Sequence, residues 1–162
     1  MGRLKDWFKG KDKEGNRYID LSIIAGLDNI PKGMLTRLTL KDEGLLIKQN
    51  YFGKGEAFLN YSQITNVGKI TEKEIYEKDK SVLGRAVAGG LVLGPLGAIV
   101  GGVSGVGKKE KKKLNIYYII NYKSSQDGEI KALSFSLGGA YQLNKFTEEL
   151  KKKAGIKDQI NL

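Results

Sequence analysis

The chain of 162 residues contains neither cysteine nor histidine. Without cysteine, no disulfide and no thiolate nucleophile can form. Without both residue types, zinc and transition-metal sites lose their usual ligands. Ser-His and Cys-His nucleophilic systems are excluded for the same reason. We therefore expect no metal site of these kinds and no catalytic residues of these nucleophilic systems.

Acidic residues are scarce relative to basic ones, with 18 Asp and Glu against 28 Lys and Arg and a formal net charge of +10. This balance favours a polyanionic partner, either nucleic acid or an anionic membrane surface, although a soluble protein that is simply basic has the same composition. The N-terminus is too charged for a signal peptide, and Asp6 stands where N-myristoylation requires Ser or Thr. We expect a cytoplasmic location at the inner face of the membrane.

Glycine is abundant and unevenly placed. Nine of the 22 glycines fall between Gly84 and Gly107, which divides a chain of single-domain length into parts of different character. The expected parts are a basic amphipathic segment (1–17), the first half of a sheet (18–80), a glycine-rich insertion (81–107), a lysine-rich linker (108–113), the last strands with a helix (114–155) and a tail (156–162).

Short strands are expected on both sides of the insertion, from alternating apolar residues and from turn residues. The expected strands before the insertion are 34–40, 45–49, 56–61 and 64–78, with 18–24 either a further strand or a lead-in that covers an edge. After it, strands at 114–123 and 129–137 flank the turn signal Asp127-Gly128.

A C-terminal amphipathic helix follows. Its apolar residues recur at spacings of three, three and four: Ala140, Leu143, Phe146 and Leu150. Lys151–Lys153 suit the last turn of this helix, and Gly155 can end it.

This order of strands and helix resembles the pleckstrin-homology-like (PH-like) superfamily, in particular small bacterial PH-like and GRAM-like domains. The residues that carry the resemblance are Leu38-Thr39-Leu40-Lys41-Asp42-Glu43-Gly44-Leu45-Leu46-Ile47, Tyr61-Ser62-Gln63-Ile64, the Phe135 strand and the Leu143-Phe146-Leu150 helix. The resemblance covers residues 34–153. It implies a mainly β (α+β) fold, a partly open antiparallel barrel capped by a helix, which is used to bind lipids or proteins and not for catalysis. On this resemblance we expect a protein that is not an enzyme, with no catalytic residues and no cofactor. The insertion departs from the usual domain.

Small residues recur at every fourth position in the insertion, within a stretch of 21 uncharged residues from Ala86 to Val106. Two rows are formed, Ala86, Gly90, Gly94, Ala98 and Gly102, and Gly97, Gly101 and Gly105. On a helix each row is a smooth groove that lets another helix backbone approach closely. The pattern predicts self-association through these eight residues. A flexible loop is the alternative, but loops are usually more polar.

The insertion has the length of a single membrane-spanning helix, about 31 Å for 21 residues. However, Gly94-Pro95 interrupts it, and a single span would separate the two halves of the sheet. A helical hairpin fits better, with arms at about 81–93 and 96–106. Arms of roughly 16–20 Å would be half-inserted in lipid or would form the dry centre of a homo-oligomer.

Basic residues flank the insertion and suit an anionic surface. They are Arg85, Lys108, Lys109, Lys111, Lys112 and Lys113. At the N-terminus, Leu4, Trp7 and Phe8 have helical spacing and either anchor at a membrane interface or pack onto the domain. A solvated charge run is the plain alternative for the lysines.

Three other patterns lead to weaker hypotheses. The stretch Gly102–Lys109 matches a phosphate-binding loop except that Lys109 replaces the Ser or Thr that holds magnesium. The acidic residues Glu72, Glu74, Glu77 and Asp79 alternate with lysines, as on a solvated strand edge. Tyr117, Tyr118 and Tyr122 lie near the lysine run, but the strand pattern accounts for them without nucleic acid.

We therefore expect a membrane-associated scaffold whose partners are itself and an anionic surface. The main alternative is a soluble homo-oligomer with a glycine-rich core that acts as a protein-interaction module. A nucleic-acid binder is the lesser alternative.

Overall fold

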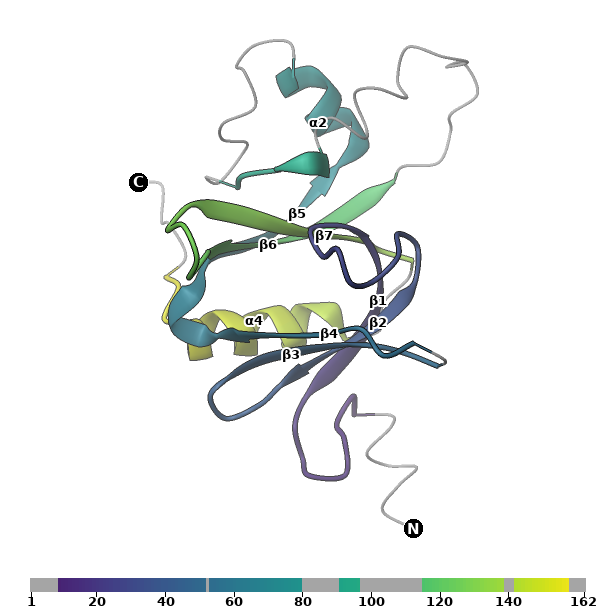
Figure 1. The fold of residues 1–162 in the computed structure, drawn as a ribbon, viewed down its shortest axis with the longest axis vertical. Coiled ribbons are helices and arrows are strands. Elements are labelled where there is room, and N and C mark those ends of the chain that lie inside the picture. The colour runs from purple at the N-terminus through teal and green to yellow at the C-terminus, as the bar shows by residue number, and fades with distance from the viewer. Residues whose placement is uncertain (1–8, 52, 80–90, 97–114, 139–141, 158–162) are drawn as a thin grey trace.

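The computed structural model describes residues 9–51, 53–79, 91–96, 115–138 and 142–157 (Figure 1). Seven strands and three helical segments are defined in these ranges. They are β1 (Tyr18–Ala25), β2 (Leu35–Leu40), β3 (Gly44–Gln49), β4 (Glu56–Asn60), the 3₁₀ turn η1 (Tyr61–Gln63), β5 (Ile64–Thr71), α2 (Glu72–Asp79), β6 (Ile116–Lys123), β7 (Ile130–Ser136) and α4 (Leu143–Ala154).

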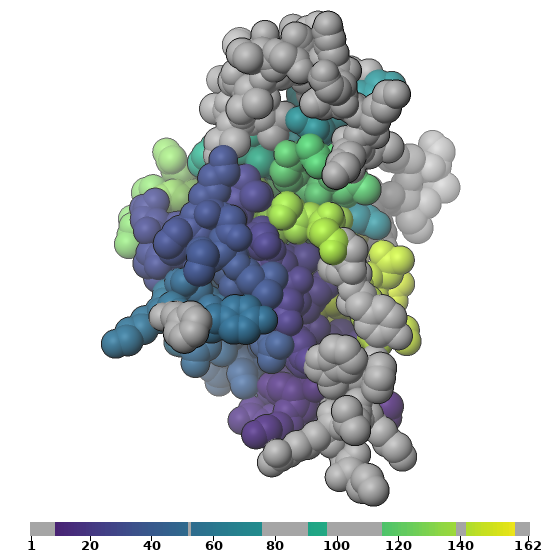
Figure 2. Space-filling model, turned by 90° about the vertical axis from the view of Figure 1, so that its right-hand side faces the viewer, coloured from purple at the N-terminus to yellow at the C-terminus, as the bar shows by residue number. Residues whose placement is uncertain are grey.

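The strands form one antiparallel sheet in the order β4-β3-β2-β1-β7-β6-β5. The end strands β4 and β5 are joined by η1, and within the described residues they do not pair with each other. Helix α4 lies in this opening and packs on β1, β5 and η1 (Figure 1). Strand β1, before the insertion, pairs with β7, after it. Figure 2 shows this contact from the side, with yellow-green β7 residues against purple β1. This is the partly open, helix-capped barrel that the sequence predicts.

Alternation of apolar residues produces the barrel interior, because successive side chains of a strand point to opposite faces. In β1, Ile19, Leu21 and Ile23 are at most 4% exposed. This strand pairs with both β2 and β7, so the stretch 18–24 is a central strand and not a lead-in over an edge. The turn at Asp127-Gly128 (Gly128 φ +73°) confirms the predicted hairpin of β6 and β7, and the turn Lys41–Gly44 joins the predicted strands β2 and β3 in a second hairpin.

Helix α4 is confirmed by its buried stripe of Leu143, Phe146 and Leu150, the last two fully buried. Ala140, the first residue of the predicted stripe, lies outside the described residues. Gly155 ends it with a left-handed conformation (φ +71°), and its N–H bonds to the last carbonyls of the helix. Arg17 ties the helix to the start of β1, since its Nε lies 2.7 Å from Glu149 Oε2.

The strand expected over 64–78 is wrong beyond Thr71, where helix α2 begins. Thr71 Oγ1 accepts the N–H of Glu74, and Glu74 Oε2 accepts the N–H of Thr71. This reciprocal capping box stabilises a helix start. The acidic run from Glu72 to Asp79 therefore lies on a helix and not on a strand edge.

Candidate functional site

The structure describes only one of the residues predicted for self-association, Gly94. The other seven lie outside the described residues: Ala86, Gly90, Gly97, Ala98, Gly101, Gly102 and Gly105. The same holds for the predicted surface contacts Arg85, Lys108, Lys109, Lys111, Lys112 and Lys113, and for Leu4, Trp7 and Phe8. What the structure places is the midpoint of the insertion, Leu91–Leu96.

This midpoint packs on the outer face of the barrel. The outer layer is a second buried cluster, separate from the barrel interior, and it joins the midpoint to β5, α2, β6 and β7. Its members are Ile70, Ile75, Leu91, Leu93, Leu96, Ile119 and Ala132. The β5–β7 part of the sheet is therefore covered on both faces.

The midpoint is an extended segment followed by a turn. The expected first helical arm does not reach its predicted end, because Leu91–Leu93 are not helical. Gly94 has φ +56°, a left-handed conformation that glycine adopts with little cost, and the Leu96 N–H bonds to the Leu93 carbonyl. Pro95 then takes the helical geometry for which its ring is preorganised. The predicted Gly94-Pro95 turn is confirmed.

Asn121 of β6 holds the backbone of the midpoint. Its Oδ1 accepts the Val92 N–H at 2.8 Å, and its Nδ2 donates to the Val92 carbonyl at 2.7 Å. The Asn121 side chain is part of a residue only 1% exposed, and its Nδ2 also lies 3.4 Å from the Lys131 carbonyl. One side-chain amide thus satisfies both backbone polar groups of the partly buried residue Val92.

Two glycines make room for this contact. A Cβ on Gly68 of β5 would lie 3.0 Å from Leu91 Cδ1, and a Cβ on Gly94 would lie 3.3 Å from the Ala132 Cβ. Both distances are tighter than ordinary van der Waals contact. A side chain at either position would therefore require its neighbour to shift by a few tenths of an ångström, and glycine allows the close approach without that shift.

A cleft of about 790 Å³ borders the midpoint turn. Gly94 and Pro95 form one wall, Phe58 and Leu59 of β4 another, and the β6–β7 hairpin with Ile130 a third. Phe58 and Ile130 are 46% and 42% exposed, and polar residues such as Asn60, Gln63 and Gln126 also line the cleft, so its lining is mixed.

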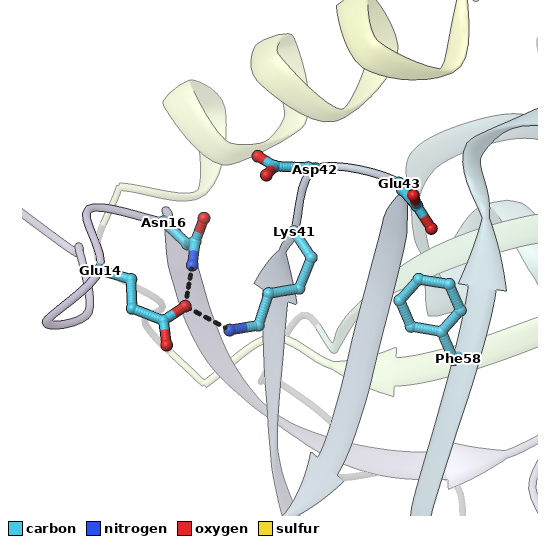
Figure 3. Close-up of a pocket in the computed structure, with 6 residues that line it drawn as sticks. All are labelled: Glu14, Asn16, Lys41, Asp42, Glu43 and Phe58. Carbon is cyan, nitrogen blue, oxygen red and sulfur yellow. Dashed lines mark hydrogen bonds and ion pairs between the residues drawn. The ribbon is translucent and has the colours of Figure 1, made fainter.

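A second, shallower cleft of about 450 Å³ lies at the β2–β3 turn (Figure 3). Glu14 contacts Lys41, while Asp42 and Glu43 lie at the turn, with Glu43 on the side of the Phe58 ring (Figure 3). Lys41 Nζ is 3.1 Å from Glu14 Oε2. The cleft is therefore locally acidic on a basic protein. Within the described ranges, no group of three acidic side chains is arranged to hold a metal ion.

Asp12 fixes the loop beside this cleft. Partial burial acts to raise the pKa of its carboxyl, but hydrogen bonds from the backbone and side chain of Asn16 and from the Glu14 N–H, together with the Lys41 charge, outweigh it and lower the pKa. Asp12 stays ionised at neutral pH and holds the Asp12–Asn16 turn against Lys41.

Residues 36–135, well over half of the chain, match the family described as the glycine zipper containing PH domain. The chain belongs to this family. The match runs from β2 to β7 and spans the insertion. No curated protein and no solved structure matches the chain.

A glycine-zipper PH domain is a binding or interaction module, and PH-like domains are generally non-catalytic. None of the described helices is long and apolar enough to cross a membrane.

Asn121 and Gly68 were not predicted from the sequence as contacts of the insertion. Their signals were a polar amide inside an apolar strand and a glycine inside a strand, which often mark close backbone approach.

Proposed function

We propose that this glycine-zipper PH domain is a non-catalytic, membrane-associated scaffold that self-associates through residues 84–105. The observation that carries the proposal is the pair of small-residue rows at four-residue spacing between basic flanks. Glycine inside a water-exposed helix costs about 1 kcal/mol relative to alanine, so such rows are favourable only in tight contact with another backbone.

Anionic lipid is the proposed surface because the charge is concentrated beside the insertion. Arg85 precedes the zipper and Lys108–Lys113 follow it, with one acidic residue among them. Basic residues next to an apolar segment bind anionic lipid at about 1 kcal/mol each near the surface. The location that follows is the inner face of the membrane.

Replacing Gly101 by Leu tests the self-association. A leucine side chain would fill the groove of the second row and keep the backbones apart, so we expect the mass measured by light scattering to fall toward the monomer value of 17.8 kDa. Gly138→Leu is the matched control, because a Cβ at Gly138 meets no atom within 4 Å. An unchanged mass for Gly101→Leu would contradict the proposal.

The soluble homo-oligomer remains the second candidate, since the midpoint of the insertion packs on protein and Leu96 is fully buried there. Co-sedimentation separates the two functions. The membrane function predicts binding to vesicles of phosphatidylglycerol and phosphatidylcholine, with weaker binding at high salt and none to phosphatidylcholine alone. An oligomer that ignores both vesicle types supports the soluble form.

A further inference from the structure

The midpoint of the insertion is already occupied within its own chain. Leu91, Leu93 and Leu96 are 5%, 6% and 0% exposed on the outer face of the sheet. A side chain buried there cannot at the same time face lipid or a second copy. Engagement of this segment elsewhere therefore requires that it leave the sheet.

The outer face has the features of a specific peptide-binding site. It offers apolar contacts from Ile70 and Ile119 and a matched donor and acceptor for one extended residue from Asn121. Gly68 provides the space that Leu91 occupies. Side chains, backbone and shape are all matched to the sequence Leu91-Val92-Leu93-Gly94-Pro95-Leu96.

We propose that the outer face of β5–β7 is an intramolecular binding site for Leu91–Leu96, and that docking there competes with self-association of the glycine-rich segment. This inference rests on the proposed function. If only the undocked molecules can associate, the apparent affinity for self-association equals the intrinsic affinity multiplied by the undocked fraction. The docked midpoint thereby restrains the zipper until lipid or a second copy outcompetes it.

The chain has enough length for release without opening the barrel. Residues 80–90 lie between α2 and the midpoint, and residues 97–114 lie between the midpoint and β6. Even the shorter connection, fully extended at about 3.3–3.6 Å per residue, reaches roughly 36–40 Å. The strands β5 and β6 can therefore keep their pairing while the midpoint moves.

A reversible lock tests the competition directly. In the double variant Gly94→Cys, Ala132→Cys the separation of the two Cβ atoms follows from the 3.3 Å between a Cβ on Gly94 and the Ala132 Cβ, slightly shorter than the spacing of about 3.5–4.5 Å found in disulfides. Gly94 has φ +56°, so a cysteine there is strained and weakens docking until the disulfide forms. The oxidised and reduced states of the variant share this strain and the same change in the zipper row, so the measurement is the difference between the two states. The native chain has no cysteine that could compete. We expect the oxidised variant to associate at least tenfold more weakly than the same variant after reduction.

Weakening the docking of Leu91–Leu96 should have the opposite effect on association. Asn121→Ala removes both bonds to Val92 without changing the insertion, and we expect association to strengthen severalfold. Thr36→Val is the matched control, since Thr36 is also fully buried and donates to a backbone carbonyl, that of Leu21, in the barrel interior. Hydrogen exchange at the buried Leu96 N–H, whose acceptor is the Leu93 carbonyl and not Asn121, shows whether Asn121→Ala has released the midpoint in a folded barrel.

The outcomes separate this inference from the proposed function. Equal association of the oxidised and reduced double variant, with Asn121→Ala like the wild type, would overturn the competition and leave self-association intact. Disulfides between chains would show that the midpoint docks on a second copy, which also overturns it. If neither wild type nor any variant associates, with or without anionic vesicles, the proposed function falls and the competition falls with it.

Discussion

The barrel interior and the outer layer are both apolar, but they are assembled differently. Among the residues that the structure describes, the interior contains 19 buried residues drawn from all seven strands, from α4 and from the connections between them. On the same basis the outer layer contains seven, three of which come from the single segment Leu91–Leu96. The outer layer can be exposed locally when one short segment, Leu91–Leu96, leaves the sheet. The interior is exposed only when the whole sheet unfolds.

Phe135→Ala should produce the largest loss of stability, because its fully buried ring lies in β7, between β1 and β6. Truncation of a buried Phe costs about 3–5 kcal/mol of unfolding free energy. Urea denaturation measures this loss. Hydrogen exchange should accelerate in both layers, including the Leu40 N–H that bonds the Arg17 carbonyl. A loss below about 1 kcal/mol would contradict the central place of this residue.

Leu96→Ala should have a smaller and more local effect, although Leu96 is also fully buried. The loss cannot exceed the free energy with which the midpoint docks, so we expect about 2 kcal/mol or less, the low end for Leu→Ala. Exchange of the Val92 N–H should accelerate while that of Leu40 does not. Equal acceleration at both amides would show that the two layers unfold together.

The interior could be predicted because its signals are local. Strand alternation, the Asp127-Gly128 turn and the Leu143-Phe146-Leu150 spacing each specify an element without knowledge of distant partners. The confirmed hairpins and α4 follow from these signals. Even α2, which was wrongly predicted as strand, had a local signal in the capping box of Thr71 and Glu74.

The outer layer could not be predicted because its signal does not name a partner. The run Ile116-Tyr117-Tyr118-Ile119-Ile120 is nearly continuous in apolar residues, as in strands covered on both faces. Such a run indicates that another part of the chain covers the outer face of the sheet as well. The periodicity does not identify which segment this is. The link between Asn121 and Val92 spans 29 residues, and only the fold brings them together.

Of the candidate site, the sequence predicted the turn at Gly94-Pro95 and missed its docking. Small residues at four-residue spacing indicate contacts between helices, and this pattern places Gly94 in the groove of a helix that contacts another helix. In the structure Gly94 instead has a left-handed conformation against Ala132. The small-residue rows indicate which surfaces a helix could pack against. The docking of the midpoint depends instead on residues of β5, β6 and β7.

Ser134→Ala should produce the smallest effect, and it should be a gain. Ser134 points to the outer face of β7 and is fully buried, and its Oγ has no hydrogen-bond partner among the described residues. Removing a buried, unsatisfied hydroxyl should raise the unfolding free energy by up to about 1 kcal/mol. The matched control is Ser124→Ala, where Oγ accepts the Gln126 N–H, so that variant should lose stability. Loss of stability in both variants, measured by urea denaturation, would show that Ser134 Oγ is satisfied and that the outer layer is as well matched in its polar groups as the interior.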